Sequence, residues 1–109
     1  MELIKEPLTE RKISDLKQRY GDYFKLTVDL ESQTLVAGVE LHADGEAILL
    51  KEGGRPENIW GGGINLNTKE IDATAVLNLR PNLGNASMEI LDPAKRERFI
   101  SIVKKIFKL

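Results

Sequence analysis

The chain has 109 residues, of which 41% are hydrophobic and 30% charged, and its formal net charge is −1. This length and balance indicate one globular domain over residues 1–109 rather than a disordered segment. The small net charge disfavours general nucleic-acid binding, because phosphate contacts require a basic excess. The absence of cysteine excludes disulfides, thiolate nucleophiles and Cys-zinc sites.

The N-terminal residues 1–6 lack the apolar run of a signal peptide. No other stretch approaches the roughly 20 apolar residues that a membrane span needs. We therefore expect a cytoplasmic protein without membrane contact, and no residue pattern identifies a cofactor.

A first amphipathic helix is predicted after Thr9, a favourable N-cap residue. Ile13, Leu16 and Tyr20 recur at helical spacing and form its apolar stripe. Gly21 supplies the stop, since glycine adopts the left-handed conformation common after a helix.

Strands are predicted at 23–30 and 35–42, joined by a hairpin connection at 31–34. The inward-facing row of the second strand is predicted to comprise Leu35, Ala37, Val39 and Leu41. Asp44-Gly45 has turn chemistry, so residues 47–51 are predicted to return as a third strand.

Two more strands are predicted at 58–66 and 71–79. Gly61-Gly62-Gly63 lies inside the first of them and indicates either a bulge or a close approach of another backbone. Residues 81–89 are predicted to form a loop. Asp92-Pro93 then begins a last helix, as an N-cap residue followed by proline at the first helical position.

The expected order is one helix, five contiguous strands and one helix. Short connections favour antiparallel pairing, because parallel strands need long crossovers. We therefore predict an α+β two-layer sandwich with a sheet of about five strands, mainly antiparallel, and with the N- and C-terminal helices on one face. The other face is left to solvent or to a partner, and it carries many of the polar side chains.

The only histidine lies in a stretch with polar residues at alternate positions, namely Glu40, His42, Asp44 and Glu46. If the chain stays extended, His42 with Asp44 and Glu46 forms a candidate metal site, because imidazole and carboxylate suit divalent cations. His42 could alternatively act as a general base beside Glu46, with Arg80 holding an anionic substrate. A third interpretation is an ordinary solvated sheet face.

The segment from Asn78 to Ser87 places one guanidinium, Arg80, before a loop rich in glycine and asparagine. Such a loop suits a carboxylate or a phosphate. The candidate ligand-binding residues are Trp60, Asn65, Asn78, Arg80, Asn85 and Ser87. The alternative is structural: the loop residues serve tight turns, Arg80 caps a carbonyl or pairs with an acid, and Trp60 closes the core.

Three motifs follow one another between residues 40 and 87. They are Glu40-Leu41-His42-Ala43-Asp44-x-Glu46, Trp60-Gly61 leading to Ile64-Asn65, and Asn78-x-Arg80-Pro81-x-x-Gly84-Asn85-x-Ser87. Together they resemble a family of small prokaryotic proteins that is catalogued as a domain of unknown function. The resemblance implies a stand-alone domain and assigns no activity and no catalytic residue.

The leading functional hypothesis is a non-enzymatic module that binds a ligand or a protein through the polar sheet face, with self-association or a protein partner. The alternative is a small metal-dependent or acid–base enzyme that uses His42 with Asp44 or Glu46. A third hypothesis, nucleic-acid processing, is supported only by Arg80 and by the basic last helix.

Overall fold

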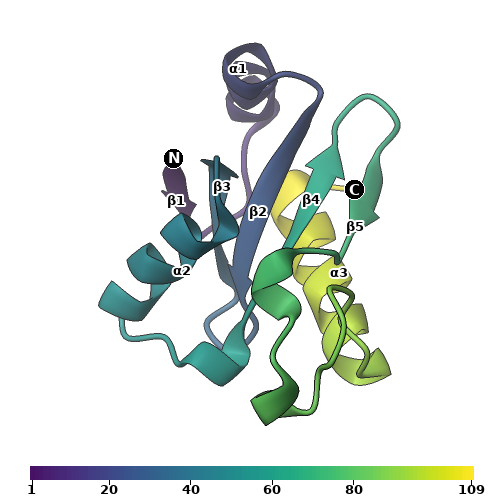
Figure 1. Cartoon of the computed structure of the whole chain (residues 1–109). Coiled ribbons are helices and arrows are strands. Elements are labelled where there is room, and N and C mark those ends of the chain that lie inside the picture. The colour runs from purple at the N-terminus through teal and green to yellow at the C-terminus, as the bar shows by residue number, and fades with distance from the viewer.

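The computed structural model describes all residues, 1–109, as one sheet with three helices (Figure 1). The strands are β1 (Glu2–Ile4), β2 (Tyr23–Asp29), β3 (Thr34–Val39), β4 (Ile59–Asn65) and β5 (Glu70–Asp72), and the helices are α1 (Glu10–Tyr20), α2 (His42–Lys51) and α3 (Pro93–Phe107). All strand pairs are antiparallel, in the order β1-β3-β2-β4-β5. The predicted α+β class, with five antiparallel strands and helices near both termini, is confirmed.

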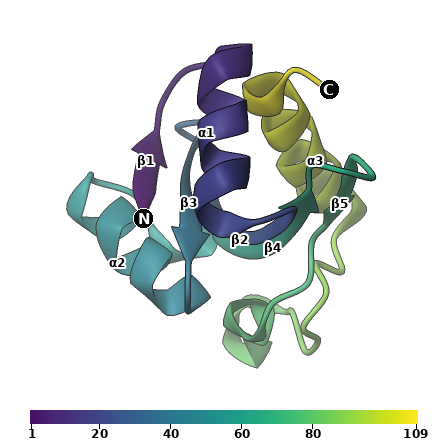
Figure 2. The same cartoon turned by 90° about the horizontal axis from the view of Figure 1, so that it is seen from above.

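The terminal helices α1 and α3 cover one face of the sheet, and α2 lies on the other (Figure 2). The larger core lies under α1 and α3, where Leu26, Val28 and Leu35 are completely buried. Burial of one such side chain contributes about 1.5–3 kcal/mol. This main core is therefore the chief source of stability.

The predicted helix caps are confirmed. The Thr9 side chain accepts a hydrogen bond from the Lys12 amide at 3.1 Å, and Gly21 follows α1 with φ of 89°. At α3 the Asp92 carboxylate accepts from the Ala94 amide at 2.9 Å, directly before Pro93. These caps satisfy amides that have no partner within the helix.

The predicted strand at 47–51 is wrong, because these residues belong to α2. Gly45 and Leu49, four residues apart, form the buried side of this helix. A Cβ atom at Gly45 would lie 2.5 Å from the Thr27 hydroxyl oxygen, so the glycine lets the helix rest directly on β2. Part of the face predicted to be open is therefore covered.

The alternation predicted along 35–42 holds only as far as Ala37. The pairing register between β2 and β3 shifts beside Lys25, and Gly38 adopts a φ of 75°. Val39 consequently packs in the smaller core under α2, and Leu41 is 63% exposed. A β-bulge of this kind reverses the facing of every later residue.

The three glycines of β4 mark close approach, as one of the two interpretations predicted, and not a bulge. Gly61, Gly62 and Gly63 pair regularly with Thr27, Leu26 and Lys25. A Cβ atom at Gly61 would meet His42 and Ala75, one at Gly62 would meet the Asp72 carbonyl and Phe99, and one at Gly63 would meet Tyr23. Each glycine thus leaves room for a neighbouring segment.

The strand predicted at 71–79 ends at Asp72, and Val76–Asn78 forms a short 3-10 turn. The buried Asn78 side chain replaces a strand neighbour here. Its amide group accepts from the Gly61 N–H at 2.8 Å and donates to the Gly61 carbonyl at 2.9 Å. The backbone N–H and carbonyl at this edge of β4 therefore form hydrogen bonds with a side chain instead of with another strand.

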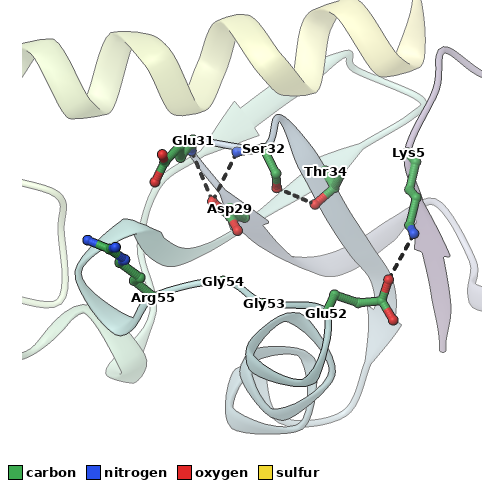
Figure 3. Close-up of a pocket in the computed structure, with 9 residues that line it drawn as sticks. All are labelled: Lys5, Asp29, Glu31, Ser32, Thr34, Glu52, Gly53, Gly54 and Arg55. Carbon is green, nitrogen blue, oxygen red and sulfur yellow. Dashed lines mark hydrogen bonds and ion pairs between the residues drawn. The ribbon is translucent and has the colours of Figure 1, made fainter.

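Helix α2 has a cavity at each end. Leu41, His42 and Ala43 line the cavity at its N-terminal end. At its C-terminal end, Glu52, Gly53 and Gly54 line a second cavity that contains only polar residues and glycine (Figure 3). No helix in the structure has the length and apolar character that a membrane crossing requires.

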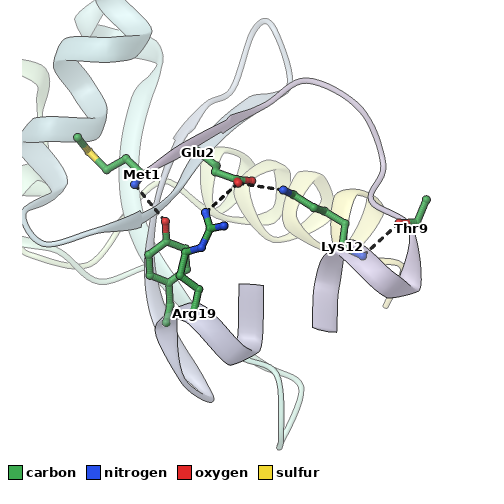
Figure 4. A network of polar contacts seen from close by, with 6 residues as sticks. Met1, Glu2, Thr9, Lys12 and Arg19 are labelled. Carbon is green, nitrogen blue, oxygen red and sulfur yellow. Dashed lines mark hydrogen bonds and ion pairs between the residues drawn. The ribbon is translucent and has the colours of Figure 1, made fainter. Parts of the chain in front are cut away.

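The edge strand β1 is tied to α1 by charged groups (Figure 4). The Glu2 carboxylate accepts from the Lys12 ammonium at 2.9 Å and from the Arg19 guanidinium at 3.2 Å. The hydrogen bond from Lys12 is the largest of the effects that lower the pKa of Glu2. The network joins the short edge strand to the covering helix.

Candidate functional site

The cavity at the start of α2, which we call the His42 cavity, has a volume of about 470 Å³. Two loops and the sheet surround it, and most of its lining is apolar. The lining residues are Lys25, Leu41, His42, Ala43, Ala75, Val76, Leu77 and Met88. Three of them are large and open to solvent, with exposed fractions of 63% for Leu41, 73% for Val76 and 48% for Met88. Such a concentration of exposed apolar groups is typical of a binding surface.

His42 is the first residue of α2 and its ring rests against β4. Its Nε2 lies 2.8 Å from the Gly62 carbonyl oxygen. Because a carbonyl only accepts, we assign the proton to Nε2. The Cδ2 edge of the ring faces Gly61, so the edge that carries Nδ1 faces away from β4.

The electrostatic surroundings favour neutral His42. Desolvation by burial is the largest effect and lowers its pKa below the usual 6.5, and the charge of Lys25 acts in the same direction. The Gly62 carbonyl and Asp72 oppose these effects without reversing them. The imidazole is therefore neutral at pH 7 and works as a fixed polar wall of the cavity.

Two side chains of β2 hold the segment that begins α2. The Thr27 hydroxyl donates to the His42 carbonyl at 3.0 Å, and the Lys25 ammonium donates to the Glu40 carbonyl at 2.9 Å. Both residues lie at alternate positions of β2, on the side of the sheet where α2 lies. Lys25 is the only charged residue that lines the cavity.

The extended geometry assumed for His42, Asp44 and Glu46 is wrong, because these residues form the first turns of a helix. His42 and Glu46 are one turn apart, whereas Asp44 points about 200° around the axis. Neither carboxylate forms a hydrogen bond with His42, and no three His, Cys, Asp or Glu side chains converge on a point that could hold a metal ion. The helix therefore separates the three predicted ligands.

Asn78 and Asn85, both predicted to bind a ligand, form the internal frame of the loop. The Asn78 amide nitrogen also contacts the Ala73 and Met88 carbonyls, at 3.3 and 3.0 Å. The Asn85 amide nitrogen donates to the Asn78, Ser87 and Glu89 carbonyls, and its oxygen accepts from the Leu91 amide. Their polar atoms already have partners within the chain, which matches the structural alternative.

Arg80 lies over the Trp60 ring, with 4.5 Å between the guanidinium carbon and the ring centroid. It donates to the carbonyls of Pro56 and Ile59, as the carbonyl-cap alternative describes. Burial lowers the pKa of Arg80 from its usual value. Trp60 itself is 1% exposed and belongs to the main core.

The other two ligand-binding candidates also contact their own loops. The Asn65 side chain accepts from the Asn67 and Thr68 amides, and the Ser87 hydroxyl accepts from the Glu89 amide. None of Trp60, Asn65, Asn78, Arg80, Asn85 and Ser87 lines the His42 cavity. The structure thus does not bring His42 and Arg80 into one cavity.

The sequence did not predict the exposed apolar rim of this cavity, formed by Leu41, Val76 and Met88. In the segment predicted as a strand at 71–79, Val76 shares a row of alternate positions with the polar residues Thr74 and Asn78, and an apolar residue in such a row is a signal of contact. Leu41 was predicted to face the core, and only the bulge at Gly38 reveals that it is exposed. Met88 lies in a loop and carries no sequence signal.

A comparison with protein-family models matches residues 2–106 to the family described as Protein of unknown function (DUF5674). Comparisons with curated proteins and with solved structures gave no match.

The single histidine permits a direct test of the His42 environment. In an NMR titration, we expect a midpoint below 6.5 and nitrogen shifts of an Nε2–H tautomer. A lowered folded-state pKa means that neutral His42 contributes stability above pH 6.5, the usual value, and that this contribution is lost as the pH falls through the folded-state pKa. A midpoint at or above 6.5, or an Nδ1–H tautomer, would contradict the geometry.

Asn78→Ala should lower the free energy of unfolding by at least about 2 kcal/mol, because it leaves buried backbone groups without partners. For a domain of this size the melting temperature should fall by roughly 10 °C. The matched control is Asn82→Ala in the same loop, where the side chain is exposed and a change within about 0.5 kcal/mol is expected. Equal effects of the two substitutions in thermal unfolding would refute the role of Asn78.

Proposed function

Because the chain belongs to the DUF5674 family, which is of unknown function, we propose from its own geometry that it is a non-enzymatic protein-binding module. The His42 cavity receives an apolar side chain of the partner polypeptide. The observation that carries this proposal is the convergence of Leu41, Val76 and Met88, all largely exposed, on one cavity.

The size and lining of the cavity support an apolar occupant. Its volume of about 470 Å³ lies within the range of small binding sites, and most of its lining is apolar. Burial of exposed apolar groups against a partner removes them from water at about 25 cal/mol per Å². The three rim residues come from separate segments, so a partner would contact the start of α2 and the 75–88 loop together.

The charge distribution supports an acidic residue beside that apolar side chain. Lys25 is the only charged lining residue, and His42 is neutral at pH 7. The N-terminal end of α2, with its partial positive charge, lies at the same place. Complementary charges improve specificity and association rate more than affinity.

Acid–base catalysis by His42 remains a second candidate, favoured by one observation: the ring is neutral and its Nδ1 edge faces away from β4. Neither Asp44 nor Glu46 bonds to the ring, and Arg80 lies outside the cavity. A general base usually needs a group that orients it. The binding module therefore has more support.

The test is an NMR titration of the methyl groups of Leu41, Val76 and Met88 with the peptide N-acetyl-Leu-Glu-amide. We expect these methyl signals to shift selectively, and more with this peptide than with N-acetyl-Leu-Lys-amide. Val76→Asp should weaken binding by about tenfold or more, since it adds a like charge and removes an apolar contact. Sedimentation velocity over a concentration range then shows whether a second copy is the partner.

Leu50→Asp is the matched control, because Leu50 is also an exposed apolar residue of this face but does not line the cavity. It should leave peptide binding unchanged. Uniform small shifts over the whole spectrum, or equal binding of the Glu and Lys peptides, would count against the proposal.

A further inference from the structure

The cavity at the C-terminal end of α2, which we call the Asp29 cavity, has a chemistry opposite to that of the His42 cavity. Its volume is about 610 Å³, and no hydrophobic residue lines it (Figure 3). It shares no lining residue with the His42 cavity. The two cavities are therefore separate sites at the two ends of one helix.

Asp29 is the distinctive residue of this cavity, since it is an acidic side chain with only 4% exposure. Its Oδ1 accepts hydrogen bonds from the Glu31 amide at 2.9 Å and from the Ser32 amide at 3.2 Å. Figure 3 shows these two bonds meeting at Asp29, and Oδ2 has no hydrogen bond within the chain. Oδ2 is therefore the Asp29 oxygen that is free to accept a hydrogen bond from a group in the cavity.

The chain keeps this oxygen accessible through a glycine. A Cβ atom at Gly54 would lie 2.7 Å from Oδ2, closer than carbon and oxygen normally approach. Gly54 itself is held by a hydrogen bond from its amide to the Leu49 carbonyl at 2.9 Å. The glycine is thus fixed at a position where any other residue would cover the oxygen.

The charges of the cavity favour a cation. Its lining has three acidic and two basic side chains, and one acid and one base, Glu52 and Lys5, form an ion pair at 2.8 Å. Asp29 and Glu31 are then opposed only by Arg55, which forms no ion pair within the chain. The negative end of the α2 dipole lies at the same place.

We propose that the Asp29 cavity binds the ammonium or guanidinium group of a small polar ligand, which donates a hydrogen bond to Oδ2 of Asp29. An anionic group would meet a free acceptor oxygen and a net negative lining, and an apolar group would meet no apolar wall. A divalent metal ion lacks a cluster of three suitable side chains here. A charged N–H donor is the group that satisfies the carboxylate.

The experiment is an amide NMR titration of the whole chain with 1,4-diaminobutane and with agmatine, which carries a guanidinium group. The uncharged control is 1,4-butanediol, which has the same length. We expect both cationic probes to shift the Ser32, Gly53 and Gly54 amides in a saturable way, at least about tenfold more tightly than the diol. This comparison needs no variant and so does not depend on the folding of one.

Asp29→Asn tests the oxygen itself, because asparagine keeps an acceptor for the Glu31 and Ser32 amides and places an NH₂ donor where Oδ2 was. Affinity for the cationic probes should fall about tenfold or more. Asp15→Asn, the same change at an exposed site on α1, should leave the affinity unchanged.

Three results would overturn the inference. The first is the absence of saturable shifts with either cationic probe, and the second is equal binding of the diol and the diamine. The third is a selective response to calcium or magnesium chloride with none to the amines, which would assign the cavity to a metal ion instead.

Discussion

The arrangement of this domain depends on the glycine run of β4, because three consecutive residues there have no side chain. Gly61 leaves space for the His42 ring and for Ala75, and Gly63 leaves space for Tyr23. The Tyr23 hydroxyl crosses the strand and donates to the Asp72 carboxylate at 2.9 Å. Burial, aided by this hydrogen bond, raises the pKa of Tyr23 to about 12. Tyr23 of β2, His42 of α2 and Ala75 of the following loop thus pack directly against the backbone of β4. This packing positions the walls of the His42 cavity.

The sequence predicts the part of the fold that local patterns control. The two-residue alternation of β2, the caps of α1 and α3, and the short connections between strands give the antiparallel sheet and its terminal helices. It does not predict α2, because Asp44-Gly45 has turn chemistry and glycine costs about 1 kcal/mol inside a helix. Only the contact of Gly45 with Thr27, distant in sequence, explains why a glycine stands there.

In the candidate site, too, local sequence patterns predict some features, and contacts between segments distant in sequence determine the others. Sequence motifs identified His42 and the segment from Asn78 to Ser87, and both border or frame the site. The role of Asn78 could not be read locally, because its amide replaces a missing strand beside Gly61. Asp29 lies in the strand predicted at 23–30, but its unpartnered oxygen depends on the position of Gly54, far along the chain. The polar residues of the Asn78–Ser87 motif therefore act mainly as hydrogen-bond partners inside their own loop, while the two proposed binding cavities lie at the ends of α2.

The most direct test of this account is an amide and histidine NMR comparison of the wild type with Gly61→Ala. The added Cβ would lie 2.7 Å from both the Ala75 Cβ and the His42 Cδ2, so it must displace both cavity walls. We predict shifts in residues 41–45 and 73–78 together, loss of the bond between His42 and Gly62, and little change in α3. Normal signals in either wall, with the change confined to β4, would contradict the claim that the glycine run positions the site.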